Sequence, residues 1–230
     1  KEMLDNISPG GAGRNRVMNR QAFLKLDCIA PPLVEQKKIA EILATYDKVI
    51  ELKERLIDEK KRQKKWLMQK LLNPESGVRL PGFTGEWKTV KIRNISEINP
   101  KSLSENTSPE YEFTYIDLSS TGEPEQIDFS RKILFKNAPS RARRIFEKND
   151  ILLSMVRPYL QNFIFVDFEP KDFICSTGFA VIHCEQNVSS KYVFYTMFSE
   201  SISRQIKKIL VGTNYPAINA EDVKNLLIPL

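Results

Sequence analysis

The sequence contains little cysteine and almost no histidine, with three cysteines and one histidine in 230 residues. Cys28, Cys175 and Cys184 are odd in number and lack the spacing of metal ligands, which argues against a disulfide framework and against a metal site. We expect buried, reduced thiols in a cytoplasmic protein. His183 lies between Ile182 and Cys184 near the end of a predicted strand, and we predict a structural role for it.

Long apolar runs and catalytic motifs are also missing. No stretch approaches the roughly 18 apolar residues of a membrane span, and the amino terminus is not a signal peptide. An adenine methyltransferase needs an Asn/Asp-Pro-Pro-aromatic motif, whereas the Asn-Pro pairs here are followed by Glu75 and Lys101. Glu112 does not begin the Glu-x-Lys pattern of a nuclease, because Thr114 stands where the lysine is needed. We therefore predict a non-catalytic protein with no cofactor, no metal and no membrane partner.

The composition allows a globular core and favours an anionic partner. Hydrophobic residues make up 41% of the chain, including 13 phenylalanines, so a substantial core can be buried. The formal net charge of +6 favours a negatively charged partner. Charge alone does not identify that partner.

Residues 31–72 are predicted to form one long helix. Pro31 and Pro32 stand ahead of its first turn, and no glycine or proline follows Val34 until Pro74. As a helix, residues 34–72 would span roughly 58 Å at about 1.5 Å per residue. Apolar residues recur at the three-and-four spacing of a coiled-coil seam: Ile39, Ile42, Leu43, Tyr46, Val49, Ile50, Leu56 and Ile57.

Two alternatives remain open for this helix. It could pack on its own domain, or it could pair with another helix, which we favour because so long a rod is difficult for one small domain to cover. Residues 58–65 are almost wholly charged. Their cations could follow a DNA backbone or form a solvated face: Lys60, Lys61, Arg62, Lys64 and Lys65.

The chain as a whole is predicted to be α+β. Residues 1–30 resemble the tail of a preceding domain, with a helical turn at 1–7, a glycine-rich break at 8–13 and a short strand at 23–29. A linker at 73–87 leads into a mostly β domain. Its predicted elements are β runs at 87–98, 112–118, 131–135, 151–156, 162–168 and 173–184, a helix at 190–210 and a strand at 223–228.

The two ends of the chain repeat each other at a constant offset of 200 residues. The matching residues are Met18, Asn19, Phe23, Leu26 and Cys28 in the first copy, and Ile218, Asn219, Val223, Leu226 and Ile228 in the second. The first copy leads into the long helix, and the second leads to Leu230. We infer a segment of a two-fold repeating architecture in which a second long helix would follow Leu230.

A set of motifs follows in order along nearly the whole chain: PPLVEQKKIAEIL (31–43), RLPGFTGEW (79–87), NDILLSMVRPYL (149–160), CSTGFAVI (175–182), GTNYPAI (212–218) and NLLIPL (225–230). In this order they resemble the DNA-specificity subunits of type I restriction-modification systems. In that family, two target-recognition domains alternate with two long helices that pack antiparallel as a spacer. Each domain reads half of a bipartite DNA site, and modification subunits with adenine methyltransferase activity dock on the assembly.

The resemblance implies that residues 31–72 form the spacer and dimerisation helix and that residues 73–230 form a target-recognition domain. Expected partners are double-stranded DNA, the methyltransferase (modification) subunit, the restriction subunit and a second copy of the chain paired through the long helix. Asn149 replaces a common glycine but tolerates a left-handed turn. Met155 stands where the family often has a basic residue, so the resemblance does not imply a phosphate contact there.

Two other functions are considered beside this one. A coiled-coil adaptor without a DNA role would explain the long helix but would leave the basic residues of the domain unused. The specificity module of a related methyltransferase-nuclease would share the DNA-reading role.

The candidate DNA-binding residues supply cations for phosphates and forked donors for bases. Residues 129–146 contain a basic run without an acidic residue: Arg131, Lys132, Lys136, Arg141, Arg143 and Arg144. A solvated basic loop is the alternative.

Further candidates lie in two predicted loops. Arg157, Tyr159 and Gln161 follow an apolar strand and are expected to emerge at its end. Asn214 and Tyr215 belong to the second loop. We expect arginines 141, 143 and 157 to contact phosphate or guanine, and Gln161 or Asn214 to contact adenine.

Overall fold

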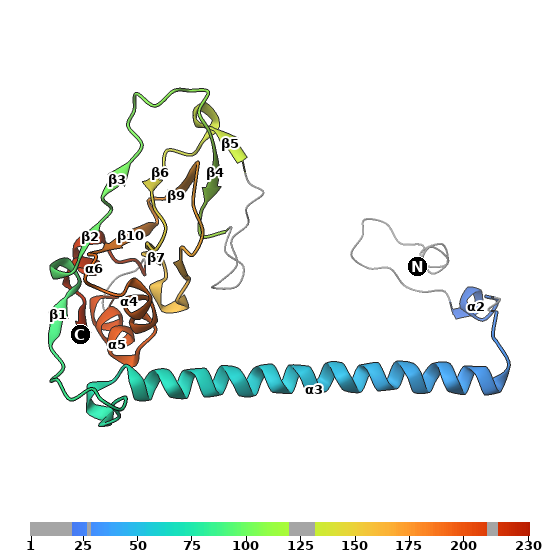
Figure 1. The fold of residues 1–230 in the computed structure, drawn as a ribbon. Coiled ribbons are helices and arrows are strands. Elements are labelled where there is room, and N and C mark those ends of the chain that lie inside the picture. The colour runs from blue at the N-terminus through green and yellow to red at the C-terminus, as the bar shows by residue number, and fades with distance from the viewer. Residues whose placement is uncertain (1–19, 27–28, 120–131, 211–215) are drawn as a thin grey trace. The chain divides into compact units, whose positions relative to one another are not determined.

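The protein was analysed as a computed structural model that describes residues 20–26, 29–119, 132–210 and 216–230 (Figure 1). The chain divides into two compact units, Lys1–Lys61 and Arg62–Leu230. No helix within the described ranges is both long enough and apolar enough to span a membrane.

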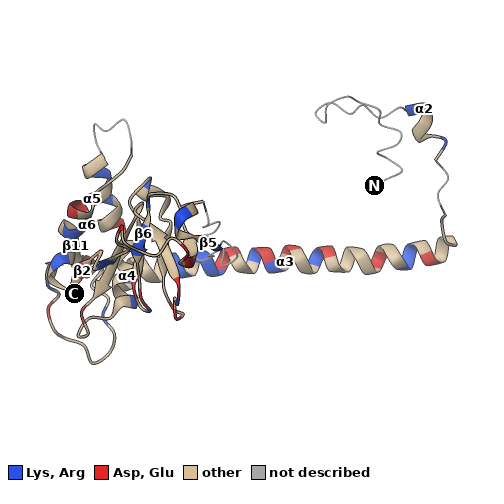
Figure 2. Ribbon diagram, turned by 90° about the horizontal axis from the view of Figure 1, so that it is seen from above, with Lys and Arg blue, Asp and Glu red and all other residues tan. Residues whose placement is uncertain are grey.

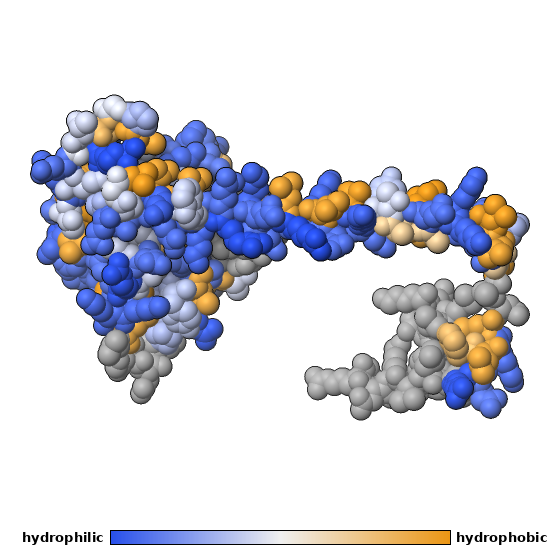
Figure 3. Space-filling view, turned by 90° about the horizontal axis from the view of Figure 1, so that it is seen from below, coloured by the Kyte–Doolittle hydropathy of each residue, from blue (hydrophilic) through white to orange (hydrophobic). Residues whose placement is uncertain are grey.

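Helix α3 extends over Leu33–Leu71, which confirms the long helix predicted for residues 31–72. Its start is fixed beside the prolines, because the Glu35 N–H donates to the Pro32 carbonyl at 2.9 Å and Gln36 Nε2 donates to the Pro31 carbonyl at 2.7 Å. None of its 39 residues is buried. The predicted seam residues are at least 41% exposed, and hydrophobic residues interrupt the hydrophilic surface along this helix in Figure 3.

The strand predicted at residues 23–29 is wrong in its described part. Arg20–Phe23 form the short helix α2, and Leu24 and Lys25 continue it as a turn. The Leu24 N–H donates to the Arg20 carbonyl at 3.1 Å, so local helical hydrogen bonding prevails over the apolar pattern. The predicted elements at 1–7 and 8–13, together with Cys28, lie outside the described residues.

The described residues of the Arg62–Leu230 unit form three sheets, which supports the predicted α+β class. One antiparallel sheet has the order β2 (Ser96–Ile98), β10 (Phe179–Cys184), β7 (Ile151–Ser154) and β8 (Phe163–Phe165). A second sheet has the order β3 (Lys101–Ser102), β6 (Ala142–Ile145), β9 (Phe173–Ser176), β4 (Glu112–Ile116) and β5 (Lys132–Leu134). Its β4 and β9 strands run parallel. The third sheet pairs β1 (Thr89–Lys91) with β11 (Leu227–Pro229).

Besides the end of α3, the described residues of this unit form three α-helices and several single-turn helices. The α-helices are α4 (Ser190–Met197), α5 (Glu200–Leu210) and α6 (Ala220–Asn225). The 3₁₀ helices are η1 (Pro74–Ser76), η2 (Ile92–Asn94), η3 (Phe135–Asn137) and η4 (Pro158–Leu160). Helix α6 begins 200 residues after α2, so both copies of the sequence repeat contain a short helix that starts at the matching position.

Several predicted boundaries need correction. The single helix predicted at 190–210 is two helices, because Ser199 Oγ accepts the Ile202 N–H at 3.3 Å and starts α5 anew. The single run predicted at 173–184 is divided between two sheets by a turn at residues 177–178. The final predicted strand begins too early, because residues 223–225 belong to α6.

Strand β7 is buried on both faces and lies at the centre of the core. Ile151 and Leu153 pack with residues of α4 and α5, whereas Leu152 packs with residues of β4 and β9. This two-sided burial explains the unbroken apolar run of the strand. The helices therefore cover one face of the four-stranded sheet, and the five-stranded sheet covers the other (Figure 1).

The prediction of buried thiols is confirmed for Cys175 but not for Cys184. Cys175 is fully buried, Cys184 is half-buried, and both are free. Burial raises the pKa of the Cys184 thiol to about 11 and holds that of Cys175 far above its ordinary value. Within the described residues, no group of three or more His, Cys, Asp or Glu side chains could hold a metal ion.

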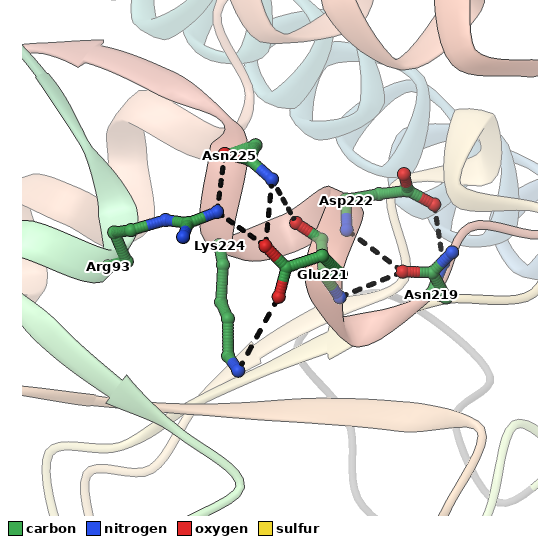
Figure 4. Close-up of polar contacts among 6 residues, drawn as sticks. All are labelled: Arg93, Asn219, Glu221, Asp222, Lys224 and Asn225. Atoms are coloured by element: carbon green, nitrogen blue, oxygen red, sulfur yellow. Dashed lines mark hydrogen bonds and ion pairs between the residues drawn. The ribbon is translucent and has the colours of Figure 1, made fainter.

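Helix α6 is closed at its first turn by a capping box (Figure 4). Asn219 Oδ1 accepts the N–H groups of Glu221 at 2.8 Å and Asp222 at 3.0 Å, while Asp222 Oδ2 accepts the Asn219 N–H at 2.9 Å. Arg93 donates to Glu221 and Asn225 and so ties η2 to this helix. These bonds hold the buried side chain of Val223 in the core.

Replacing Asn219 with alanine is expected to lower the free energy of unfolding by about 1 kcal/mol, because two backbone N–H groups lose their acceptor. Urea denaturation followed by circular dichroism measures this change. Lys224→Ala is the control on the same helix, since Lys224 makes only an exposed ion pair, and its effect should stay within about 0.5 kcal/mol. Equal stability of Asn219→Ala and the unmutated chain would contradict a stabilising role for the cap.

Candidate nucleic-acid interface

The chain turns sharply out of the core after β7. Ser154 Oγ donates to the Val156 carbonyl at 2.6 Å, and the Met155 N–H donates to the Gly178 carbonyl at 2.8 Å. Met155 packs against the buried core rather than facing outward. The first side chain fully on the surface is therefore Arg157.

Residues 157–161 form a compact turn with left-handed backbone at both ends. The φ angles are +48° at Arg157 and +55° at Gln161, on either side of η4. A non-glycine residue adopts such a conformation at a cost of about 1–3 kcal/mol. Pro158 is buried, whereas Tyr159 and Leu160 are exposed. Arg157 and Tyr159 are thus exposed at the end of a buried strand, as predicted, whereas Gln161 is only partly exposed.

A second segment lies directly beside this turn. The Arg157 N–H donates to the Pro216 carbonyl at 2.8 Å, and Val156 forms an antiparallel bridge with Ala217. Of the second predicted loop, Asn214 and Tyr215 lie outside the described residues.

Helix α5 lies against η4 and adds cations that the sequence analysis missed. Gln161 Nε2 donates to Ser203 Oγ at 3.3 Å, so this amide, a predicted adenine contact, is engaged with the helix. Arg204, Lys207 and Lys208 are exposed on α5, and helical spacing places them on the side opposite the buried Ile202 and Ile206. Their three-and-four spacing is the signal that could have identified them. Figure 2 colours the lysines and arginines of the ribbon blue.

The basic run at 131–144 is divided among several environments. Arg131 lies outside the described residues, and Lys132 is exposed in β5. Lys136 Nζ pairs with Glu110 at 2.8 Å on an exposed surface. Arg141 is exposed in the turn before β6.

The last two arginines of this run have different neighbours. The Arg143 guanidinium lies over the Phe135 ring, 4.9 Å from its centroid. Arg144 Nη1 donates to Ser102 Oγ at 3.1 Å, across the β3–β6 pair. Strand β6 is irregular between Ala142 and Arg144. The consecutive basic residues of the sequence therefore do not form one continuous basic surface.

His183 has a structural partner. Its Nδ1 lies 2.7 Å from Asp150 Oδ1, and the second carboxylate oxygen of Asp150 accepts the Glu147 N–H at 2.7 Å. Burial raises the pKa of Asp150, although the Glu147 N–H and His183 act in the opposite direction. Asn149 has a φ of +70°, which confirms that it accepts the left-handed turn. These residues close the turn before β7, in agreement with a structural role for His183.

One cation of the predicted basic stretch at 60–65 packs within the Arg62–Leu230 unit. Lys64 Nζ lies 5.7 Å from the centroid of the Tyr195 ring on α4. Its side chain is thus partly engaged by an aromatic face rather than fully solvated.

Comparison with known proteins assigns most of the sequence to one family profile. The model described as type I restriction modification DNA specificity domain matches residues 3–62 and 84–230. The MjaVIII specificity subunit of a type I restriction enzyme from Methanocaldococcus jannaschii is 25% identical over 100% of this chain, which covers 57% of that protein. The HindI specificity subunit from Haemophilus influenzae is 26% identical over 61% of this chain and 31% of its own length.

Solved structures give a consistent likeness. An HsdS subunit from Thermoanaerobacter tengcongensis matches with a TM-score of 0.56 and 31% identity, over 69% of this chain and 40% of that chain. A type I restriction-modification S subunit from M. genitalium has the same fold, with a TM-score of 0.57 at 15% identity over 86% of this chain and 50% of that one. The chain thus spans about half or less of the length of most of these relatives.

Replacing Arg157 with glycine is expected to leave the free energy of unfolding unchanged or to raise it by up to about 1 kcal/mol, because glycine adopts the left-handed backbone without strain. Thermal and urea unfolding measure this change. Arg141→Gly is the control at an exposed arginine without a left-handed backbone. A loss of stability in Arg157→Gly larger than in the control would mean that the arginine side chain holds the turn together.

Proposed function

Because the chain belongs to the type I restriction-modification DNA-specificity family, we propose that it reads one half of a bipartite DNA site and docks the modification subunits there without catalysing a reaction itself. In this proposal residues 73–230 form the recognition domain and residues 31–72 form the spacer. The observation that carries it is the turn at 157–161, which stands beside the cations of α5.

This arrangement has the two components that DNA recognition needs. The exposed cations at 157, 204, 207 and 208 suit phosphate oxygens, which supply most of the affinity. A rigid turn among them suits contact with base edges, because bases are read by side chains held in register by the phosphate contacts. A coiled-coil adaptor without a DNA role would leave both components without use.

Replacing Arg157 and Lys207 together with alanine is expected to weaken DNA binding. The slope of log affinity against log salt should become shallower by up to about one for each lost phosphate contact. Fluorescence anisotropy of a labelled random-sequence duplex, titrated at several salt concentrations, measures both quantities. The same titration of Arg141→Ala with Arg143→Ala tests the basic run at 131–144.

The matched control removes the same charge from other surfaces of the unit. Lys91 on β1 is exposed and Lys224 on α6 is partly exposed, and their double alanine variant should keep the slope of the unmutated chain. Equal slopes for the Arg157/Lys207 variant and this control would place the DNA elsewhere on the protein.

The exposed seam of α3 supports a second part of the proposal, that two copies pair through antiparallel long helices. An antiparallel pair centred between Asp47 and Lys48 would set Ile39 against Leu56 and Tyr46 against Val49. Covering the half-exposed side chains of the seam contributes on the order of 10 kcal/mol for each helix. The two recognition domains would then bind two DNA half-sites that are related by a two-fold axis.

The double variant Ile42→Glu with Val49→Glu is expected to be a folded monomer that binds a single half-site weakly, because charge in the seam opposes pairing. Sedimentation velocity measures the oligomeric state. Ala40→Glu with Ala44→Glu is the control, since both alanines are exposed and stand off the seam. A monomeric unmutated chain at tens of micromolar would assign the seam to a different partner and would overturn the homodimer.

A further inference from the structure

Helix η4 presents two large apolar side chains that are exposed in the part of the chain that the structure describes. Tyr159 is 51% exposed and Leu160 is 52% exposed. Among the described residues from 88 to 230, the other exposed large hydrophobic side chains are less exposed, at 39% for Tyr195 and 41% for Leu227 and Leu230. An aromatic and an aliphatic side chain in adjacent positions are therefore held in water on one turn.

The turn at residues 157–161 is held to the rest of the domain by its first two residues and its last one. Pro158 is buried, and the hydrogen bonds of Arg157 to Pro216 and of Gln161 to Ser203 hold its two ends. The Leu160 N–H also donates to the Arg157 carbonyl at 2.9 Å, which closes the turn on itself. A turn already ordered in a strained conformation loses little further freedom on binding, so its tip is suited to enter a tight space.

Cations stand next to this apolar tip. Arg157 precedes it in the chain, and α5, which packs against η4, exposes Arg204, Lys207 and Lys208. A protein partner bound through an apolar tip does not require such flanking charge, whereas duplex DNA offers phosphates on both sides of its stacked bases. Apolar wedges between base steps are a known way in which proteins unstack and kink a duplex.

We propose that Tyr159 and Leu160 form a wedge that enters a base step of the DNA half-site and unstacks it. This inference rests on the proposed function, since it needs the domain to bind duplex DNA. The cations hold the backbone, and the wedge makes binding depend on how easily the contacted step opens. Sequence would then be read in part through deformability, at a step where no base edge is hydrogen-bonded.

The test uses the full chain and a duplex that it selects from a random-sequence pool. 2-Aminopurine, whose fluorescence rises when it leaves the base stack, is placed at each position of the selected half-site in turn. The unmutated chain is expected to raise the fluorescence at one step. Tyr159→Ala with Leu160→Ala should abolish that rise while the salt slope of binding stays the same, because the phosphate contacts remain.

Two further variants separate the wedge from a loss of folding or of surface area. Tyr195→Ala with Leu227→Ala removes a matched pair of exposed side chains from α4 and β11 and should keep the fluorescence rise. Tyr159→Phe keeps the ring and should also keep the rise. Both must give the circular dichroism spectrum of the unmutated chain.

The outcomes are distinguishable. If the chain selects no duplex from the pool, both the proposed function and the wedge are wrong. A duplex that is bound without a fluorescence rise at any position, or a rise that survives in Tyr159→Ala with Leu160→Ala, would overturn the wedge alone. Unchanged DNA binding with loss of binding to the modification subunit in that variant would assign the apolar pair to a protein partner.

Discussion

The burial of β7 on both faces is the constraint on which the rest of the recognition unit depends. Ile151 and Leu153 hold the helices, and Leu152 holds the five-stranded sheet, so the strand cannot shift without disturbing both layers. The residues that follow it consequently leave the core at a fixed place. A one-residue slip in register would exchange the two faces of the strand and would withdraw Arg157 from the surface.

Much of this architecture could be predicted from local sequence. The long helix, the apolar runs of β4, β7 and β8 and the left-handed turn at Asn149 each follow from periodicity or from the preference of a single residue. Breaks inside long apolar runs were harder to find. The hydroxyl cap at Ser199 and the two-residue turn before β10 produce only a weak signal in an apolar sequence.

In the candidate interface, too, some residues could be predicted from local sequence and others could not. Residues 157 and 159 were predicted because they follow a strand, and strand ends can be read locally. The basic run suggested one surface, but Arg143 stacks on Phe135 whereas Arg144 bonds to Ser102, and only the three-dimensional pairing of β6 reveals this. Helical spacing could have placed the cations of α5 on one exposed face, but not beside η4, because that packing joins segments about 45 residues apart.

The anchoring of η4 relies on main-chain groups and on one buried proline, while the side chains at its tip touch little of the protein. Substitutions at positions 159 and 160 can therefore accumulate without weakening the support beneath them. Stability and surface chemistry are uncoupled at this turn, so selection can act on one without changing the other. A domain built in this way can explore new recognition chemistry by single mutations while it remains folded throughout.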